Sequence, residues 1–203
     1  MEIEAKFLVP DEATWLQLQT VDQIAGYTLS SGQTKQVHDT FVDTPDRKIL
    51  ASQYVCRKRE VDGHIVMTLK QGQTVEGAVH RREEWEVTLE HEQPIGQWPP
   101  SEIRERLLSV VGDVPLVPLF DQHQTRIVRW ASLAGREVAE VSVDHVMLSI
   151  KGREQSYYEL EVELKASGTE GDLAQMAASL ATEWHLPPDT RSKFSRALAL
   201  ASL

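Results

Sequence analysis

Three charged side chains near the start of the chain have a spacing that suits metal and anion binding. Glu2, Glu4 and Lys6 alternate with apolar residues, so in a β-strand all three would lie on one face. Two carboxylates at this spacing can share a hard divalent cation, and a lysine one step further can reach an anion held by that cation. Because half-exposed strands commonly alternate in this way, the pattern predicts a site only if other strands repeat it.

Other segments of the chain do carry charge that is sorted face by face. On alternate positions the sequence places Arg57 and Arg59, Thr68 and Lys70, Arg82 with Glu84 and Glu86, the single Arg126, Glu140 with Ser142 and Asp144, and Glu159 with Glu161 and Glu163. Carboxylates that face inward repel one another unless cations neutralise them, and inward arginines and lysines need anions. A divalent metal bound together with a polyphosphate satisfies both requirements.

About eight strands must position these residues. Strand-like alternation occupies residues 1–9, 36–43, 54–60, 64–70, 79–89, 122–130, 137–150 and 157–165, and we expect 71–78 to be a loop. Helices are predicted after Pro10-Asp11, over 101–111 and 169–184, and from about Arg191 to the end. Most connections are short, which favours antiparallel pairing. The predicted fold class is therefore α+β, a closed antiparallel eight-stranded barrel with flanking helices, charged faces inward and the apolar core outside the wall.

Composition limits the class of protein. The 203 residues fit one domain, 1–203, and contain no apolar run long enough to span a bilayer. The net charge of −10 argues against a protein that coats nucleic acid. Cys56 is the single cysteine, so no internal disulfide is possible and a zinc site is disfavoured. Since the N-terminus begins with glutamates rather than a basic and then an apolar segment, we expect a cytoplasmic protein.

Taken in order, these motifs resemble the CYTH domain, or triphosphate tunnel metalloenzyme, family. The Glu-x-Glu-x-Lys signature is matched by Glu2, Glu4 and Lys6. The resemblance continues through Asp43-Thr44-Pro45-Asp46, Arg57-Lys58-Arg59, Thr68-Leu69-Lys70, Arg82 with Glu84 and Glu86, Arg126, Asp144, the run 159–163, and Ser192-Lys193. The resemblance covers nearly the whole chain. Within the family, the sequence is most similar to bacterial inorganic triphosphatases. Two departures are Val55, where a leucine is usual, and Phe41-Val42, where an aromatic pair is common.

The resemblance implies an eight-stranded tunnel that holds a triphosphate, with a role for each matched residue. The implied ligands of Mg²⁺ or Mn²⁺ are Glu2, Glu4, Asp144, Glu159 and Glu161, and the implied phosphate-binding residues are Lys6, Arg57, Arg59, Lys70, Arg126 and Lys193. Among these, Glu2, Glu4, Lys6, Arg57 and Arg59 are the expected catalytic residues. Further tunnel residues are Arg82, Glu84, Glu86, Glu140 and Glu163.

The leading functional prediction is metal-dependent hydrolysis of inorganic triphosphate to pyrophosphate and phosphate. Thiamine triphosphatase and class IV adenylyl cyclase activities are alternatives, but no aromatic or apolar residue at the matched positions can be assigned to a thiazole or purine ring. A non-catalytic polyphosphate-binding module is an alternative of another class, and the many carboxylates disfavour it because they would oppose an anion. The expected partner is a small-molecule triphosphate, bound by a monomer or a homodimer.

Overall fold

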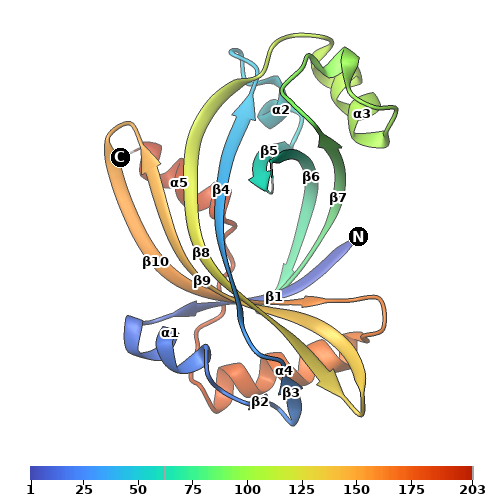
Figure 1. The fold of residues 1–203 in the computed structure, drawn as a ribbon. Coiled ribbons are helices and arrows are strands. Elements are labelled where there is room, and N and C mark those ends of the chain that lie inside the picture. The colour runs from blue at the N-terminus through green and yellow to red at the C-terminus, as the bar shows by residue number, and fades with distance from the viewer. Residues whose placement is uncertain (62, 203) are drawn as a thin grey trace.

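A closed barrel dominates the computed structural model, which describes residues 1–61 and 63–202. Its strands are β1 Glu2–Val9, β4 Gln33–Asp43, β5 Tyr54–Val61, β6 His64–Glu76, β7 Val79–Leu89, β8 Val117–Leu133, β9 Arg136–Ile150 and β10 Arg153–Leu164. They follow one another in the order β8, β4, β5, β6, β7, β1, β10, β9, and antiparallel pairing of β9 with β8 closes the ring. The prediction of a closed antiparallel eight-stranded barrel with flanking helices is confirmed (Figure 1).

The remaining elements lie around the barrel. Two short strands, β2 Gln23–Ile24 and β3 Tyr27–Leu29, extend the sheet from β8. The helices are α1 Glu12–Leu18, α2 Lys48–Ala51, α3 Glu102–Val111, α4 Glu170–Thr182 and α5 Lys193–Ser202, with a 3-10 turn, η1 Ile95–Gln97. In Figure 1, α1 and α4 lie below the barrel and α3 lies at its upper end. None of the described helices combines the length and the apolar character needed to cross a membrane.

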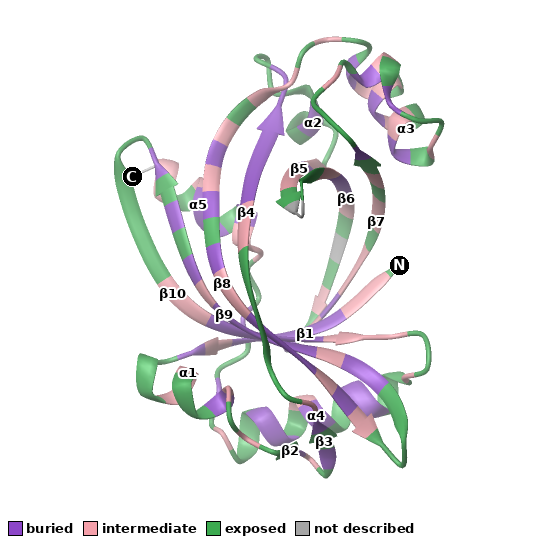
Figure 2. Cartoon of the chain, in the orientation of Figure 1, coloured by how far each residue is buried: buried purple, intermediate pink, exposed green. Residues whose placement is uncertain are grey.

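Most of the apolar core lies outside the barrel wall, as expected. Ala5 and Phe7, which alternate with the charged residues of β1, pack in one cluster with Met176 of α4. In a second cluster Cys56 of β5 packs with Ile103 of α3. Figure 2 shows the resulting alternation of buried and less buried positions along the strands. The period of two therefore sends apolar side chains to the helices and charged ones to the interior.

One apolar cluster lies inside the barrel, where we expected only charge. Phe41 of β4 stacks on Phe120 of β8 with ring centroids 4.7 Å apart, and Phe194 of α5 is 5.4 Å from Phe41 and 5.6 Å from Phe120. Phe41 shares its face of β4 with Asp39, and both line the interior cavity. The expectation of a core entirely outside the wall is therefore wrong at this end, because α5 brings its own apolar residues to the inner face.

The segment 71–78 is a second correction. We expected a loop, but β6 continues to Glu76 and pairs with β7 on both sides of a register shift between Gln71 and Thr74. Gly72, at φ +63°, lies within this shift. A glycine inside a strand commonly marks a bulge of this kind, since a β-bulge needs a backbone conformation that other residues resist. We predicted that the strand ends before Gly72, whereas Gly72 lies at an irregularity within the strand.

The Asp43-Thr44-Pro45-Asp46 motif has a structural role. The carboxylate of Asp43, 1% exposed, accepts hydrogen bonds from the backbone N–H groups of Thr44 at 2.7 Å, Ile49 at 2.9 Å and Leu50 at 3.1 Å. It thereby satisfies backbone donors at the start of α2 that have no partner within the helix. This motif closes β4 and starts α2 and does not contribute to the interior cavity.

Candidate active site

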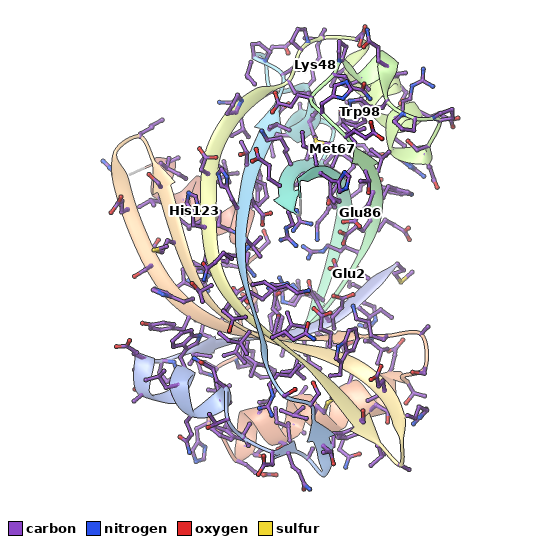
Figure 3. All side chains as sticks on the ribbon, in the orientation of Figure 1. Glu2, Lys48, Met67, Glu86, Trp98 and His123 are labelled. Atoms are coloured by element: carbon purple, nitrogen blue, oxygen red, sulfur yellow. The ribbon has the colours of Figure 1, made fainter. Side chains whose placement is uncertain are left out.

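A cavity of about 780 Å³ occupies the interior of the barrel. Of the residues predicted to form the site, the cavity is lined by Glu2, Glu4, Lys6, Arg57, Arg59, Lys70, Arg82, Glu84, Glu86, Arg126, Glu140, Glu161, Glu163 and Lys193. Figure 3 labels two of them, Glu2 of β1 and Glu86 of β7. The other two predicted residues, Asp144 and Glu159, are 0% and 1% exposed and lie beneath the lining. The structure thus brings the whole predicted set to the inner side of the barrel wall, either in the cavity lining or directly beneath it.

Strand register decides which charged residues meet. Glu159 lies directly opposite Asp144 in the pairing of β10 with β9, and Glu161 lies directly opposite Lys6 in the pairing of β10 with β1. Side chains directly opposite each other in an antiparallel pair have Cβ atoms about 5 Å apart. Residues that are more than a hundred positions apart in the sequence are consequently placed within reach of one ligand.

Three buried carboxylates form the most acidic point of the cavity wall. Asp144, Glu159 and Glu161 each offer an oxygen atom within 4.8 Å of the others. Lys193 extends from α5 into this cluster, where its Nζ atom contacts Glu159, lies 2.9 Å from Glu161 and lies 3.4 Å from Asp144. The guanidinium of Arg126 donates to Asp144 at 2.6 and 2.9 Å and to Glu161 at 2.7 Å. Basic side chains therefore neutralise the carboxylates of this cluster.

This cluster, which we call the carboxylate triad, fits Mg²⁺ or Mn²⁺. Hard divalent cations take carboxylate oxygens as ligands, and three such groups converge here in a buried position. Glu2 and Glu4, the other two predicted ligands, lie on the neighbouring strand β1, and Lys6 bridges Glu4 to the triad through Glu161. The chemistry of the donors supports the predicted metal, while the roles of individual ligands stay predictions.

Lys6 and Glu161 stabilise each other in their charged forms. Lys6 Nζ donates to Glu161 at 2.6 Å and lies 3.3 Å from Glu4. Burial acts to lower the pKa of Lys6, but the charges of Glu161 and Glu4 outweigh it and the pKa is raised. For Glu161 burial acts to raise the pKa, and Lys6 and Arg126 outweigh it and hold the pKa well below its usual range. Both groups stay ionised at neutral pH, as a charged binding site requires.

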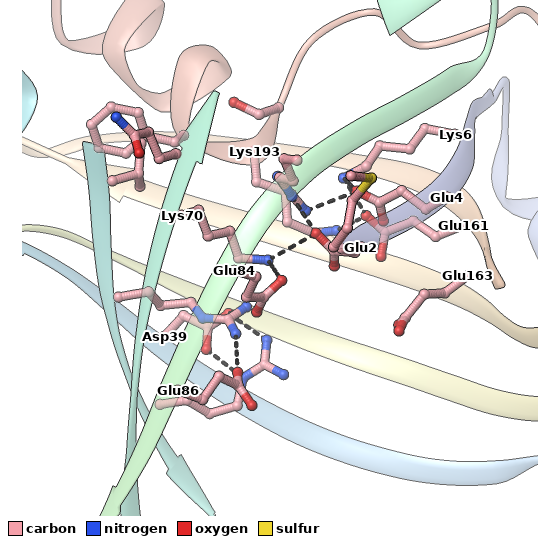
Figure 4. A pocket seen from close by; sticks show the side chains of 18 of the residues that line it. Glu2, Glu4, Lys6, Asp39, Lys70, Glu84, Glu86, Glu161, Glu163 and Lys193 are labelled. Atoms are coloured by element: carbon pink, nitrogen blue, oxygen red, sulfur yellow. Dashed lines mark hydrogen bonds and ion pairs between the residues drawn. The ribbon is translucent and has the colours of Figure 1, made fainter. Parts of the chain in front are cut away.

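A second set of ion pairs joins β1, β6 and β7 (Figure 4). Arg82 donates to Glu2 and, at 2.8 Å, to Glu4. Lys70 lies 3.0 Å from Glu84 and 3.5 Å from Glu2. Glu2 is therefore shared between two basic residues, whereas Glu84 has one basic partner and lies next to another carboxylate.

The unequal surroundings of Glu84 predict how stability depends on pH. Burial, opposed by Lys70 and reinforced by Glu2, raises the pKa of Glu84 to about 7. Between the ordinary pKa of 4.5 and 7 the folded protein binds more protons than the unfolded chain at this group. The metal-free protein should therefore lose stability as the pH rises through this window, with a slope of up to about 1.4 kcal/mol per pH unit from this group. Urea unfolding at pH 5, 6, 7 and 8 measures that slope.

Glu84→Gln is the variant that isolates this contribution. Glutamine cannot titrate, so the variant should lose most of the decline in unfolding free energy between pH 5 and 8. The exposed Glu154 of β10 gives a matched control, since Glu154→Gln should leave the slope as it is. If Glu84→Gln and Glu154→Gln both behave like the starting protein, the raised pKa is not a property of Glu84.

Arginines of β5 form a basic wall across the cavity. Arg59 donates to both carboxylate oxygens of Asp39, at 2.6 and 2.8 Å. Arg57, two residues earlier on the same face, donates to the hydroxyl of Thr68 at 3.0 Å, which in turn donates to Glu86 at 2.8 Å. Each guanidinium keeps further N–H groups beyond these bonds, and such planar donors match phosphate oxygens.

Sequence reasoning missed several residues of the cavity. The structure adds Asp39, Phe41, Phe194 and Lys165 to the lining. Asp39 had a usable signal, because on alternate positions of its strand it lies between the apolar residues Val37 and Phe41. A charge among apolar residues indicates a buried partner, and here that partner is Arg59.

Apolar side chains also line part of the cavity. Phe41, Val55 and Phe194 lie among its lining residues. The prediction about organic rings concerned the positions matched by the family motifs, and these three side chains lie outside that set. Their grouping depends on α5 folding back against β4, which no local pattern in the sequence reveals.

Residues 1–197 match the CYTH domain family, and the chain belongs to that family. Among curated proteins it is similar to an inorganic triphosphatase of Haemophilus influenzae, with 26% identity over 204 residues that cover 99% of this chain. The chain spans about half, 55%, of the length of that relative.

Solved structures share the fold. A putative adenylyl cyclase from Hippeastrum with a dominant triphosphatase activity matches with a TM-score of 0.75 and 21% identity, covering 100% of this chain and 98% of the other. A putative adenylate cyclase from Bacillus halodurans matches with a TM-score of 0.63 and 20% identity, covering 97% and 96% of the two chains. At these identities the likeness concerns the fold of the barrel.

Proposed function

We propose that this protein hydrolyses inorganic triphosphate to pyrophosphate and phosphate with Mg²⁺ or Mn²⁺, in the cytoplasm. The observation that carries the proposal is a single cavity in which a buried carboxylate triad adjoins inward-facing arginines and lysines. A surface that bound only anions would gain nothing from buried carboxylates, since they repel a polyphosphate. The name of the Haemophilus relative, inorganic triphosphatase, supports the same substrate.

Basic residues of the wall would bind and orient the substrate. Arg57, Arg126 and Lys6 would donate to phosphate oxygens and spread the negative charge that develops during transfer to water. A metal held by the triad would neutralise phosphate charge and lower the pKa of a bound water. Glu84, a carboxylate of the cavity lining, would take up the proton of the attacking water.

A substrate with an organic group is the second candidate, because Phe41, Val55 and Phe194 line one part of the cavity. Thiamine triphosphate or ATP would place its ring against these side chains, giving thiamine triphosphatase or adenylyl cyclase activity. We favour the inorganic substrate because charged residues make up most of the lining.

Inorganic triphosphate should have a higher kcat/KM than thiamine triphosphate or ATP. Phosphate release from each substrate at limiting concentration, with Mg²⁺ and Mn²⁺ in turn, measures the ranking, and anion chromatography identifies the products. We expect phosphate and pyrophosphate from the inorganic substrate and no cyclic AMP from ATP. Formation of cyclic AMP would favour the cyclase. A preference for thiamine triphosphate would favour the vitamin phosphatase, and tight binding without product would favour a binding module.

A further inference from the structure

Asp39 is a buried carboxylate inside the basic wall, at a position where a phosphate site should not need one. It lies on β4 and is 1% exposed, although it belongs to the lining of the cavity. Arg59 donates a hydrogen bond to each of its oxygens, from Nε to Oδ1 at 2.6 Å and from Nη2 to Oδ2 at 2.8 Å. Arg57 Nη1 lies 3.8 Å from Oδ2. The carboxylate is thus shared by the two arginines expected to bind phosphate.

Two glutamines hold Asp39 from the other side. Gln124 and Gln122, on the neighbouring strand β8, are 1% and 0% exposed, and their amide groups lie 3.0 and 3.4 Å from Asp39 Oδ2 as donors. Neither glutamine belongs to the cavity lining, so both lie behind Asp39 relative to a ligand. Asp39 is therefore held by glutamines of β8 on one side and by arginines of β5 on the other.

The surroundings of Asp39 differ from those of the carboxylate triad. Asp144, Glu159 and Glu161 converge on one another as metal ligands do. The oxygens of Asp39 instead face only N–H donors among the described residues that contact them. Such a carboxylate orients guanidinium groups and does not bind a cation of its own.

We propose that Asp39 is a positioning residue for triphosphate binding, which acts by holding Arg59, and through it the basic wall, in the orientation that meets phosphate oxygens. This inference rests on the proposed function. Because a bidentate pair uses two N–H groups of Arg59 on one edge, the remaining donors are directed away from Asp39. Gln122 and Gln124 hold Asp39 from the side of β8. If Asp39 acts through Arg59, it should favour binding only while Arg59 is present.

A double-mutant cycle distinguishes positioning from a general structural role. Calorimetry with a non-hydrolysable triphosphate analogue and Mg²⁺ would give Kd for the starting protein, Asp39→Asn, Arg59→Ala and the double variant. Asp39→Asn should weaken binding about tenfold, because Arg59 loses the charged partner that orients it. In the Arg59→Ala background the same change should strengthen binding, since Asp39 then positions no Arg59 and its negative charge only repels the phosphates. A purely structural role gives additive losses.

The control and the readout without ligand complete the test. Asp121 lies on β8 and bonds His38 and Thr40 outside the cavity, so Asp121→Asn should leave Kd unchanged. The Nε–H signal of Arg59 in ¹⁵N NMR, assigned by its loss in Arg59→Ala, should be protected from exchange and lose that protection in Asp39→Asn. If the Arg59 Nε–H is protected from exchange but the protein does not bind the analogue, the proposed function is rejected while the contact between Asp39 and Arg59 is supported. Binding with additive losses in the cycle would overturn the role of Asp39 alone.

Discussion

Glu161→Gln should reduce the turnover of inorganic triphosphate by about a thousandfold or more. Glu161 is the point at which the proposed metal and substrate sites meet, since it contacts Lys6, Arg126 and Lys193 and belongs to the carboxylate triad. Glutamine keeps the shape of the side chain but removes the charge that a divalent cation requires. Steady-state phosphate release at saturating substrate, with Mg²⁺ and with Mn²⁺, measures the loss.

The same experiment tests dependence on metal. Excess EDTA should abolish the activity of the starting protein, and added Mg²⁺ or Mn²⁺ should restore it, because without a cation the carboxylate triad cannot help to neutralise the phosphate charge. Glu92→Gln is the matched control, since Glu92 pairs with Lys58 on the exposed outer face and should leave turnover unchanged. Circular dichroism and Tm separate a folding defect from a catalytic one. Full turnover in EDTA would exclude the proposed mechanism.

Arg57→Ala should raise the Kd for the triphosphate analogue by about 10- to 100-fold, the loss expected for one or two charge-assisted hydrogen bonds. Arg57 lies in the cavity wall, and among its described contacts only Thr68 accepts a hydrogen bond from it, so donors remain for a ligand. Arg57→Lys restores the positive charge without the planar fork and should recover only part of the affinity. Isothermal titration of the three proteins measures the series.

Thr68 provides the internal control for Arg57. Thr68→Val removes the hydroxyl that accepts from Arg57 but leaves the guanidinium in the cavity, so it should weaken binding less than Arg57→Ala does. A salt titration adds a further check, because the contribution of Arg57 should shrink as ionic strength rises. Unchanged affinity in Arg57→Ala would show that this face of β5 does not meet the substrate.

Much of the fold follows from local pattern. Alternation with a period of two assigned seven strands after the first one and separated a charged or polar face from an apolar one on several of them, because neighbouring side chains of a strand point to opposite sides. The predicted helix over 169–184 is confirmed over Glu170–Thr182, where Thr169 and Asp172 form a capping box at its start. The same alternation nominated the charged residues that the structure collects along the cavity.

Tertiary structure alone decided how those charges combine. The triad exists because antiparallel register sets Glu159 opposite Asp144, and Lys193 reaches it because the chain after α4 returns across β1 before α5 begins. The contact of Phe41 with Phe194 and the hydrogen bonds from Arg59 to Asp39 likewise join distant segments. A strand's own sequence shows which side chains share a face. Which neighbour that face meets depends on register and barrel closure, so these contacts were beyond prediction from local pattern.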